Sequence, residues 1–287
     1  MMLIVFLIII KNWLINNNKI MNDLNYYWIN LDKAKDRRIF MENQFKKIGV
    51  VNNHRISAYT PDDLSSILID NPPYNCGYPE CIQNGCKNCP IEFAVLCSHM
   101  KAIQEGYKSN APYFIVCEDD IGFPFEIDFN KMISVIPDEI DIIQMMVITE
   151  GHTNHFYYEF YKKGHLFIRY SPITPSAAFY LISRNGAKKL LYKYLDPNTN
   201  KFNFQNCNFL KLADVLIFQS VNTIVSTMPF VIPNIDFDSQ IHQNYYDTII
   251  KPAYFKIIEV IKDDNASNPF IKKVNYPLDD VEKLFKS

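Results

Sequence analysis

The sequence has no excess of charge of either sign and no basic block. Its 287 residues carry 29 Lys and Arg against 31 Asp and Glu, which gives a formal net charge of −2 at pH 7. A protein that works on nucleic acid or on an anionic membrane surface normally presents a basic patch, so both classes of partner are disfavoured. A ligand with a few phosphates stays compatible with this composition, because a local site can bind it.

A long apolar run and an internal repeat are also missing. The first ten residues, MMLIVFLIII, are apolar, but a bilayer span needs about 20 such residues. The run has the length of a signal-peptide core, yet it has no basic residues before it and no small-residue cleavage site. Met21 stands just before the first predicted strand, and we expect translation to start there, which predicts a cytoplasmic protein. If residues 1–21 belong to the mature chain, a secretory or membrane-associated protein is the alternative.

What is present is the composition of a folded globular protein, with 48% apolar and 21% charged residues. The length fits one elaborated domain better than two large ones. We therefore divide the chain into an apolar N-terminal segment at 1–21, one main domain at 22–250 and a C-terminal extension at 251–287.

Four of the seven cysteines cluster in CGYPECIQNGCKNC, within a segment at 72–90 that we interpret as an insertion. They are spaced C-x4-C-x4-C-x2-C, and they are Cys76, Cys81, Cys86 and Cys89. Four thiols in a short loop suit a tetrahedral structural zinc ion, and two disulfides or free thiols are the alternatives. A closed set of four ligands leaves no open position for a substrate, so we expect a staple rather than a reaction centre.

The hydrophobic pattern alternates between strands and helices. YYWINL at Tyr26–Leu31 and YFIVCE at Tyr113–Glu118 are typical of buried strands, as are stretches that begin at His54 and Asp141. A helix is predicted with Asp36 as its cap and Gly49 at its end. Longer helices are predicted over 91–110 and 183–195. This alternation predicts an α/β fold with a mostly parallel central sheet and helices on both faces.

Three acids, Glu118, Asp119 and Asp120, follow the predicted strand at 113–118. Ligands of parallel sheets gather at the carboxyl ends of strands. Adjacent carboxylates repel one another unless a cation offsets their charge, and Mg²⁺ takes one or two carboxylates together with phosphate oxygens. The motif therefore predicts a divalent cation that binds a diphosphate. A single acid would be explained by a strand exit alone.

Three functional classes are compatible with such a motif. One is transfer of a sugar from a nucleotide, which the resemblance described below makes the leading hypothesis. A metal-dependent phosphohydrolase is the second, although such enzymes usually have more Asp and His than the six scattered histidines here. A non-catalytic binding protein that uses the Cys-rich loop is the third.

Four blocks of the sequence resemble, in this order, glycosyltransferase family 25, which includes lipooligosaccharide and procollagen galactosyltransferases. They are WINLDKAKDRR at Trp28–Arg38, EFAVLCSHMKAI at Glu92–Ile103, YFIVCEDDIGF at Tyr113–Phe123, and SAAFYLISRNGAKKLL at Ser176–Leu191 followed by LADVLIF. The blocks span most of residues 26–245. The Cys-rich segment is not part of the common family pattern.

The resemblance implies a GT-A-like domain that inverts the anomeric centre of a UDP-sugar with Mn²⁺ or Mg²⁺. It implies transfer of a hexose, which we expect to be galactose, to a glycan or a hydroxylysine-type acceptor on a protein. Glu118 and Asp120 would hold the metal, and His242 would complete its shell, although most lone loop histidines have no such role. Asp214, in LADVLIF, would be the catalytic base, with a helix cap as the alternative role.

The same resemblance places a group of polar residues beside the sugar nucleotide: Asn30, Asp32, Arg38, Ser98, His99 and Asp119. For Arg38 the alternative is a solvated residue at a helix start. For His99 the alternative is a buried histidine that bonds to the backbone.

Overall fold

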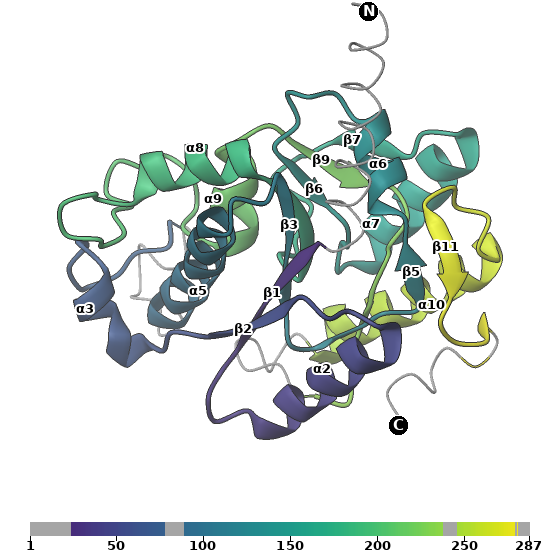
Figure 1. The fold of residues 1–287 in the computed structure, drawn as a ribbon, viewed down its shortest axis with the longest axis horizontal. Coiled ribbons are helices and arrows are strands. Elements are labelled where there is room, and N and C mark those ends of the chain that lie inside the picture. Colours follow the sequence, from purple (N-terminus) through teal and green to yellow (C-terminus); the bar gives the residue numbers. More distant parts are fainter. Residues whose placement is uncertain (1–23, 78–88, 238–245, 279, 281–287) are drawn as a thin grey trace, which may run out of the picture.

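A seven-stranded mixed sheet forms the centre of the molecule in the computed structural model, which describes residues 24–77, 89–237, 246–278 and 280 (Figure 1). The strand order is β2-β1-β3-β8-β6-β9-β7. The strands are β1 (Asn25–Asn30), β2 (Asn53–Ser57), β3 (Tyr113–Glu118), β6 (Ile142–Gln144), β7 (Phe167–Arg169), β8 (Phe179–Ser183) and β9 (Thr223–Ser226).

Five of these seven strands run in one direction. β1 is parallel to β2 and β3, and β6 is parallel to β9. β8 lies antiparallel between β3 and β6, and β7 is antiparallel to β9 at the edge. The predicted mostly parallel sheet is therefore confirmed, with two reversed strands that the sequence pattern did not predict.

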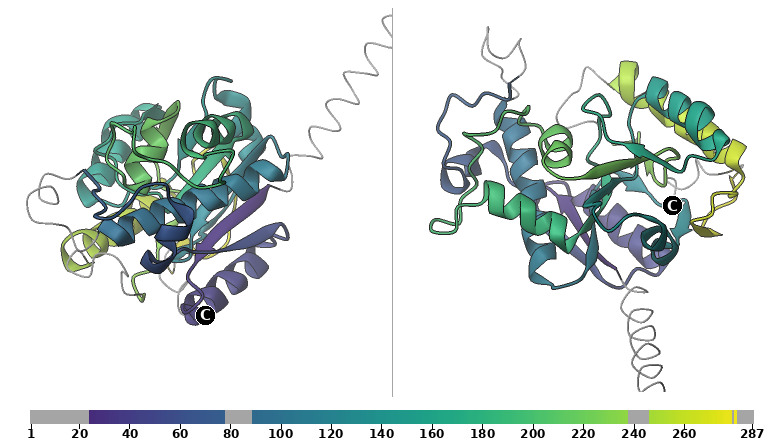
Figure 2. Two further views of the ribbon diagram at one scale, coloured as in Figure 1. Left: turned by 90° about the vertical axis from the view of Figure 1, so that its left-hand side faces the viewer. Right: turned by 90° about the horizontal axis from the view of Figure 1, so that it is seen from above.

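Helices cover both faces of the sheet, as predicted (Figure 2). On one face lie α5 (Cys89–Lys108), α8 (Arg184–Tyr194) and α9 (Ala213–Gln219). On the other lie α2 (Lys35–Ile48), α6 (Phe129–Val135) and α10 (Lys251–Asp264). Two shorter helices are α3 (Leu64–Ile67) and α7 (Glu150–His155), and α7 packs on α10.

The alternation of side chains along β3 explains the two apolar layers. Phe114 and Val116 pack with the α5 side, whereas Ile115 and Cys117 pack with the α2 side. Because successive strand residues point to opposite faces, a continuous apolar run is what a strand covered on both faces requires. The approach of α5 is close, since a Cβ atom on Gly106 would lie 2.2 Å from the ring of Phe114.

The helix ends test the predicted caps. Ser183 caps α8 by accepting a hydrogen bond from the backbone N–H of Gly186 at 3.0 Å. Gly49 ends α2 in the left-handed region with φ 73°, as predicted. The prediction that Asp36 caps α2 is wrong, because the helix begins at Lys35, two residues earlier than that cap requires. Ala34 is the N-cap, and Asp36 lies in the first turn, where its negative charge still suits the helix dipole.

Two small antiparallel pairs hold the chain that follows the acidic motif. β4 (Ile121–Gly122) pairs with β10 (Ile232–Pro233), and β5 (Phe125–Ile127) pairs with β11 (Ile271–Val274). The side chains of α10 join the same apolar layer as α2. The segment after the acids is thus anchored by residues from late in the sequence.

Three of the predictions fall partly or wholly outside the described residues, and one of these is His242 as a metal ligand. Residues 1–21 lie there, as do Cys81 and Cys86, so the zinc site stays a prediction. Cys76 and Cys89 are buried at the two ends of that segment, and the N–H of Cys76 donates to Cys89 Sγ at 3.3 Å. In the part of the chain that is described, no helix has both the length and the apolar character that a membrane crossing needs.

Candidate active site

The polar residues predicted from the sequence gather where β1 and β3 end. The register pairs Ile29 with Glu118, so Asn30 at the end of β1 lies beside the start of the acidic motif. β8 runs the other way, so its first residues, which follow Ser176, reach the same edge of the sheet. This edge combines the carboxyl ends of parallel strands with the amino end of a reversed strand.

Asp119 points inward and is fully engaged by the protein. Its Oδ2 accepts a hydrogen bond from Asn30 Nδ2 at 2.6 Å, and its Oδ1 accepts one from Arg37 Nη1 at 2.9 Å. Asn30 itself is only 2% exposed. Burial raises the pKa of Asp119, while the charge of Arg37 and the bond from Asn30 act against that rise. Asp119 is therefore a buried carboxylate that is ion-paired with Arg37 and hydrogen-bonded to Asn30 beneath the two partly exposed acids.

Arg37, rather than its neighbour Arg38, contacts the acidic motif. Arg37 Nη1 also donates to Asp120 Oδ2 at 3.1 Å. The side chain of Arg38 is 52% exposed and donates to Glu42 at 2.9 Å along the helix surface. The difference follows from helix periodicity, because Arg37 shares the buried face of α2 with Met41 and Phe45, whereas Arg38 lies on the open face.

Glu118 and Asp120 lie on the side of the motif that is exposed to solvent, which is called the open side below. Their side chains are 33% and 31% exposed. One oxygen of each is engaged, Glu118 Oε1 by His99 and Asp120 Oδ2 by Arg37, and the hydrogen bonds of the described residues leave the second oxygen of each uncommitted. Burial, followed by the charge of Glu118, raises the pKa of Asp120.

This donor set fits a hard divalent cation that brings further ligands of its own. Mg²⁺ typically takes one or two carboxylates and fills its remaining positions with phosphate oxygens and water. No group of three or more His, Cys, Asp or Glu side chains with metal-binding geometry occurs among the described residues, and His242 lies outside them. Within the acidic motif, Glu118 and Asp120 are the two carboxylates that are partly exposed.

His99 is closed to solvent, at 0% exposure, and both of its ring nitrogens have partners. Nε2 lies 3.2 Å from Glu118 Oε1, and Nδ1 lies 3.3 Å from the hydroxyl of Tyr180. Ser98 is also buried, and its hydroxyl donates to the carbonyl of Ala94 and accepts from the N–H of Tyr59. Direct contact of either residue with a nucleotide would require rearrangement, because the protein already occupies their polar atoms.

Asp214 lies in the first turn of α9, and its side chain reaches the backbone of another segment. Its Oδ2 accepts a hydrogen bond from the N–H of Ser176 at 3.3 Å, just ahead of β8. Burial raises the pKa of Asp214 from 3.8 to about 6, and the charges of Glu92 and Glu118 act in the same direction. The charge of Glu118 is therefore one of the causes that raise the pKa of Asp214.

Ser176 holds a backbone conformation that side chains rarely adopt, with φ 135°. Its carbonyl accepts from Gln144 Nε2 at 2.8 Å, and its hydroxyl accepts from the N–H of Ala178 at 3.2 Å. These bonds fix the strained residue and direct its N–H at Asp214. Backbone strain of this kind is concentrated at functional sites.

The outermost predicted residue is Asp32, whose side chain is 74% exposed. It accepts a hydrogen bond from Arg55 Nη2. That bond, followed by one from Ser57, lowers the pKa of Asp32. The structure thus groups Asn30, Asp32 and the three acids at one edge, while Arg38 points away from it.

Three residues of this edge were not predicted from the sequence. Arg37 could have been found from the helical period, since it stands four residues before Met41 on the apolar face. Arg55 could not, because its partners depend on how β2 pairs with β1. Ser176 could not either, because a serine gives no sequence signal for a positive φ, in contrast to a glycine.

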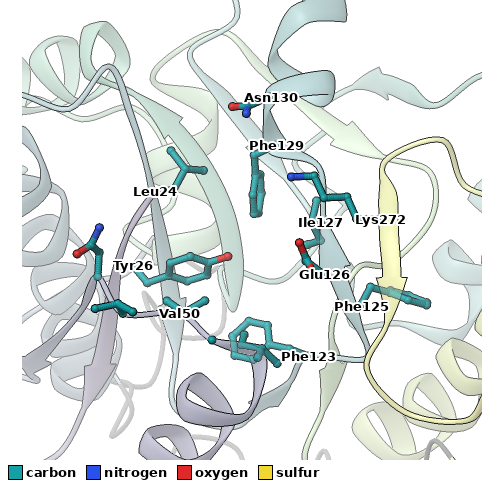
Figure 3. Close-up of a pocket in the computed structure, with 14 residues that line it drawn as sticks. Leu24, Tyr26, Val50, Phe123, Phe125, Glu126, Ile127, Phe129, Asn130 and Lys272 are labelled. Carbon is teal, nitrogen blue, oxygen red and sulfur yellow. The ribbon is translucent and has the colours of Figure 1, made fainter. Parts of the chain in front are cut away.

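A separate pocket of about 150 Å³ opens at the opposite, amino-terminal edge of β1 (Figure 3). Tyr26, Phe123 and Phe129 form its apolar part, and Glu126 and Lys272 project into it. It is lined by Leu24 before β1, whereas the acidic motif adjoins the residues after β1. The pocket therefore does not belong to the candidate active site.

Comparison with known proteins gives one family. The family model described as "Glycosyltransferase family 25 (LPS biosynthesis protein)" matches residues 23–204, which is more than half of the chain. The match includes the acidic motif, Arg37 and His99, and it ends before Asp214. A search among curated proteins finds no match.

Proposed function

Since the chain belongs to glycosyltransferase family 25, and is therefore a glycosyltransferase, we propose that it transfers a hexose from a UDP-sugar to a glycan or hydroxylysine-type acceptor with inversion. Galactose is the sugar we propose first. The α/β architecture is consistent with a GT-A-like fold. The donor, the sugar, the acceptor and the metal requirement are all parts of this proposal.

The observation that carries the proposal is the division of labour among the three acids. Asp119 is ion-paired with Arg37 and accepts a hydrogen bond from Asn30, while Glu118 and Asp120 each keep one oxygen uncommitted and partly exposed. A motif that served only as a strand exit would not need two partly exposed carboxylates supported by a buried ion pair. We propose that Glu118 and Asp120 hold Mn²⁺ or Mg²⁺, with His242 as a further proposed ligand.

A divalent cation at this position would neutralise the charge that develops on the departing diphosphate. The chain's own residues then have the task of orienting the donor. We propose a direct contact to the sugar nucleotide from Asp32, and contacts from Asn30, Arg38, Asp119, Ser98 and His99 only after rearrangement, because their polar atoms are bonded within the protein or point away from this edge. Asp32 is the most exposed of this group.

Asp214 is the proposed catalytic base. The acceptor hydroxyl oxygen forms a bond to the anomeric carbon while the bond from that carbon to the phosphate oxygen breaks, and UDP leaves. The hydroxyl proton passes to the Asp214 carboxylate and then to solvent. A base works best when its pKa is close to the working pH, and burial has raised the pKa of Asp214 to about 6.

The test is a panel of UDP-sugars measured by thermal shift and by transfer to glycan and hydroxylysine-peptide acceptors, with Mn²⁺ and with chelator. We expect one UDP-sugar to raise the melting temperature and to turn over only when the metal is present, because a ligand that binds the folded state stabilises it. Folded protein that neither binds UDP nor consumes any UDP-sugar would refute the proposal. Phosphate release from simple esters without an acceptor would instead identify a phosphohydrolase.

A further inference from the structure

Arg55 contacts two residues of the candidate site although it was not predicted to belong to it. It lies in β2, next to β1, and its side chain is 21% exposed. Its Nε donates to Asn30 Oδ1 at 2.8 Å, and its Nη2 donates to the carbonyl of Asn30 at 3.2 Å and to Asp32. One guanidinium therefore binds the side chain and the backbone of the last residue of β1.

The first consequence is that the Asn30 side chain can adopt only one orientation. Its carbonyl oxygen faces a guanidinium, which can only donate. Its amide nitrogen must then face the opposite way, where it donates to Asp119 Oδ2 at 2.6 Å and to the carbonyl of Ala34 at 3.1 Å. The flipped orientation would set donor against donor and acceptor against acceptor in a buried position, which is costly.

The second consequence reaches the acidic motif. Asn30 and Arg37 occupy the two oxygens of Asp119, and Arg37 continues to Asp120. A continuous series of hydrogen bonds thus crosses three adjacent parallel strands, from β2 through β1 to the end of β3. Arg55 begins this series and contacts none of the three acids itself.

We propose that Arg55 is a positioning residue for the acidic motif, and that it acts through Asn30. By fixing the Asn30 amide, it holds Asp119 in the interior and so keeps Glu118 and Asp120 directed to the open side, where the metal and the diphosphate would bind. This inference rests on the proposed function. Residues that orient a metal ligand from outside its shell typically change metal affinity or activity by about 10–100-fold when they are lost.

The experiment compares Arg55→Met, Arg55→Lys and Asn30→Ala, alone and in the double variant Arg55→Met/Asn30→Ala. Arg169→Met is the matched control, because Arg169 is an exposed arginine in the strand at the other edge of the same sheet. Mn²⁺ affinity by electron paramagnetic resonance, kcat and KM for the UDP-sugar, and stability in urea are measured for each. Hydrogen exchange of the Asn30 side-chain amide is followed by NMR, with Asn30→Ala providing the assignment.

We expect Arg55→Met to weaken Mn²⁺ binding and lower kcat by about 10-fold or more. In the Asn30→Ala background the same substitution should add little, because the coupling passes through Asn30. Arg55→Lys should restore only part of the loss, since an ammonium cannot reproduce the forked contact. The Asn30 amide should lose its protection in Arg55→Met and keep it in Arg169→Met.

Two results would overturn the positioning role. One is an Arg55→Met protein with the Mn²⁺ affinity and kcat of Arg169→Met, even if it is less stable, which would show that Arg55 only joins β2 to β1. The other is a full effect of Arg55→Met in the Asn30→Ala background. If the wild-type protein neither binds Mn²⁺ nor uses a UDP-sugar, the proposed function fails. The orientation of Asn30 is tested separately: an Asn30 side-chain amide that stays protected from exchange in Arg55→Met shows that Arg55 does not fix it.

Discussion

Replacing Asp214 with Asn should strongly reduce transfer and at the same time stabilise the protein. The carboxylate of Asp214 is largely desolvated, and this desolvation and the charges of Glu92 and Glu118 disfavour its ionised form. The rise of its pKa from 3.8 to about 6 corresponds to about 3 kcal/mol of destabilisation when the group is ionised. An asparagine has the same shape, carries no charge, and still offers an oxygen to the N–H of Ser176.

The sign of the effect determines its pH dependence. The pKa of Asp214 is higher in the folded state than in the unfolded state. Its contribution to the free energy of unfolding is therefore most favourable below about pH 3.8, and this contribution is lost as the pH rises through about 6. The free energy of unfolding of Asp214→Asn should therefore exceed that of wild type by about 3 kcal/mol at pH 8, by about half of that at pH 5, and by close to zero at pH 3.5. Transfer at pH 8 should fall about 100-fold or more, because the variant has no group to take the acceptor proton.

The assay is urea unfolding in chelator at several pH values, together with transfer kinetics at pH 8. Asp196→Asn is the control, since hydrogen bonds from the backbone of Thr199 and Asn198 lower the pKa of this exposed carboxylate and predict the opposite sign. A variant that retains transfer within about threefold of wild type refutes Asp214 as the base. A variant that is less stable than wild type at pH 8 refutes the electrostatic reasoning.

Three further predictions concern the metal ligands, the buried ion pair and the helix contact. Glu118→Gln should leave the urea midpoint nearly unchanged but weaken Mn²⁺ binding, measured by titration, by more than the roughly 10-fold that loss of an outer-shell partner costs; unchanged affinity would exclude Glu118 as a ligand. Arg37→Met should lower the free energy of unfolding by about 3 kcal/mol, because it leaves Asp119 buried without its countercharge; a stability within experimental error of wild type in urea would contradict this. Gly106→Ala should destabilise by about 1–3 kcal/mol, because the added methyl meets the ring of Phe114. The same change at helical Gly151, which has open space around it, should be neutral or slightly stabilising, and equal effects in urea at the two glycines would refute the packing argument.

The sequence predicts the elements of this fold better than it predicts their neighbours. Local periodicity identifies the helix over α5, the buried strand β3 and the glycine that ends α2, because each depends on residues close together in the chain. The insertion of reversed β8 between β3 and β6 is a long-range choice that leaves no local pattern. The predicted start of α2 was wrong by two residues, because the N-cap, Ala34, has no side chain that could mark it as a cap.

The same distinction holds at the candidate site. The acidic motif is visible in the sequence, since three adjacent carboxylates are unusual at the end of an apolar strand. Their separate environments are not visible, because these depend on Asn30 and Arg37 from other elements. Glu118 and Asp120 lie on one side of the chain, whereas Asp119 points to the interior. The three acids differ because Asn30 of β1 and Arg37 of α2 bond both oxygens of Asp119 and leave the other two carboxylates partly exposed.

The position of β9 has a consequence for the order of folding. β9 separates β6 from edge strand β7, although both precede it in the chain, and among the described strands β7 pairs only with β9. During synthesis, β7 therefore has no strand to join until the residues of β9 have been made, and α9 with Asp214 immediately precedes them. Contacts this distant in sequence form slowly, because a long loop must close first. This edge of the sheet is therefore completed late, and a nascent chain carries the acidic motif before it has either the strand that β7 requires or the proposed base Asp214.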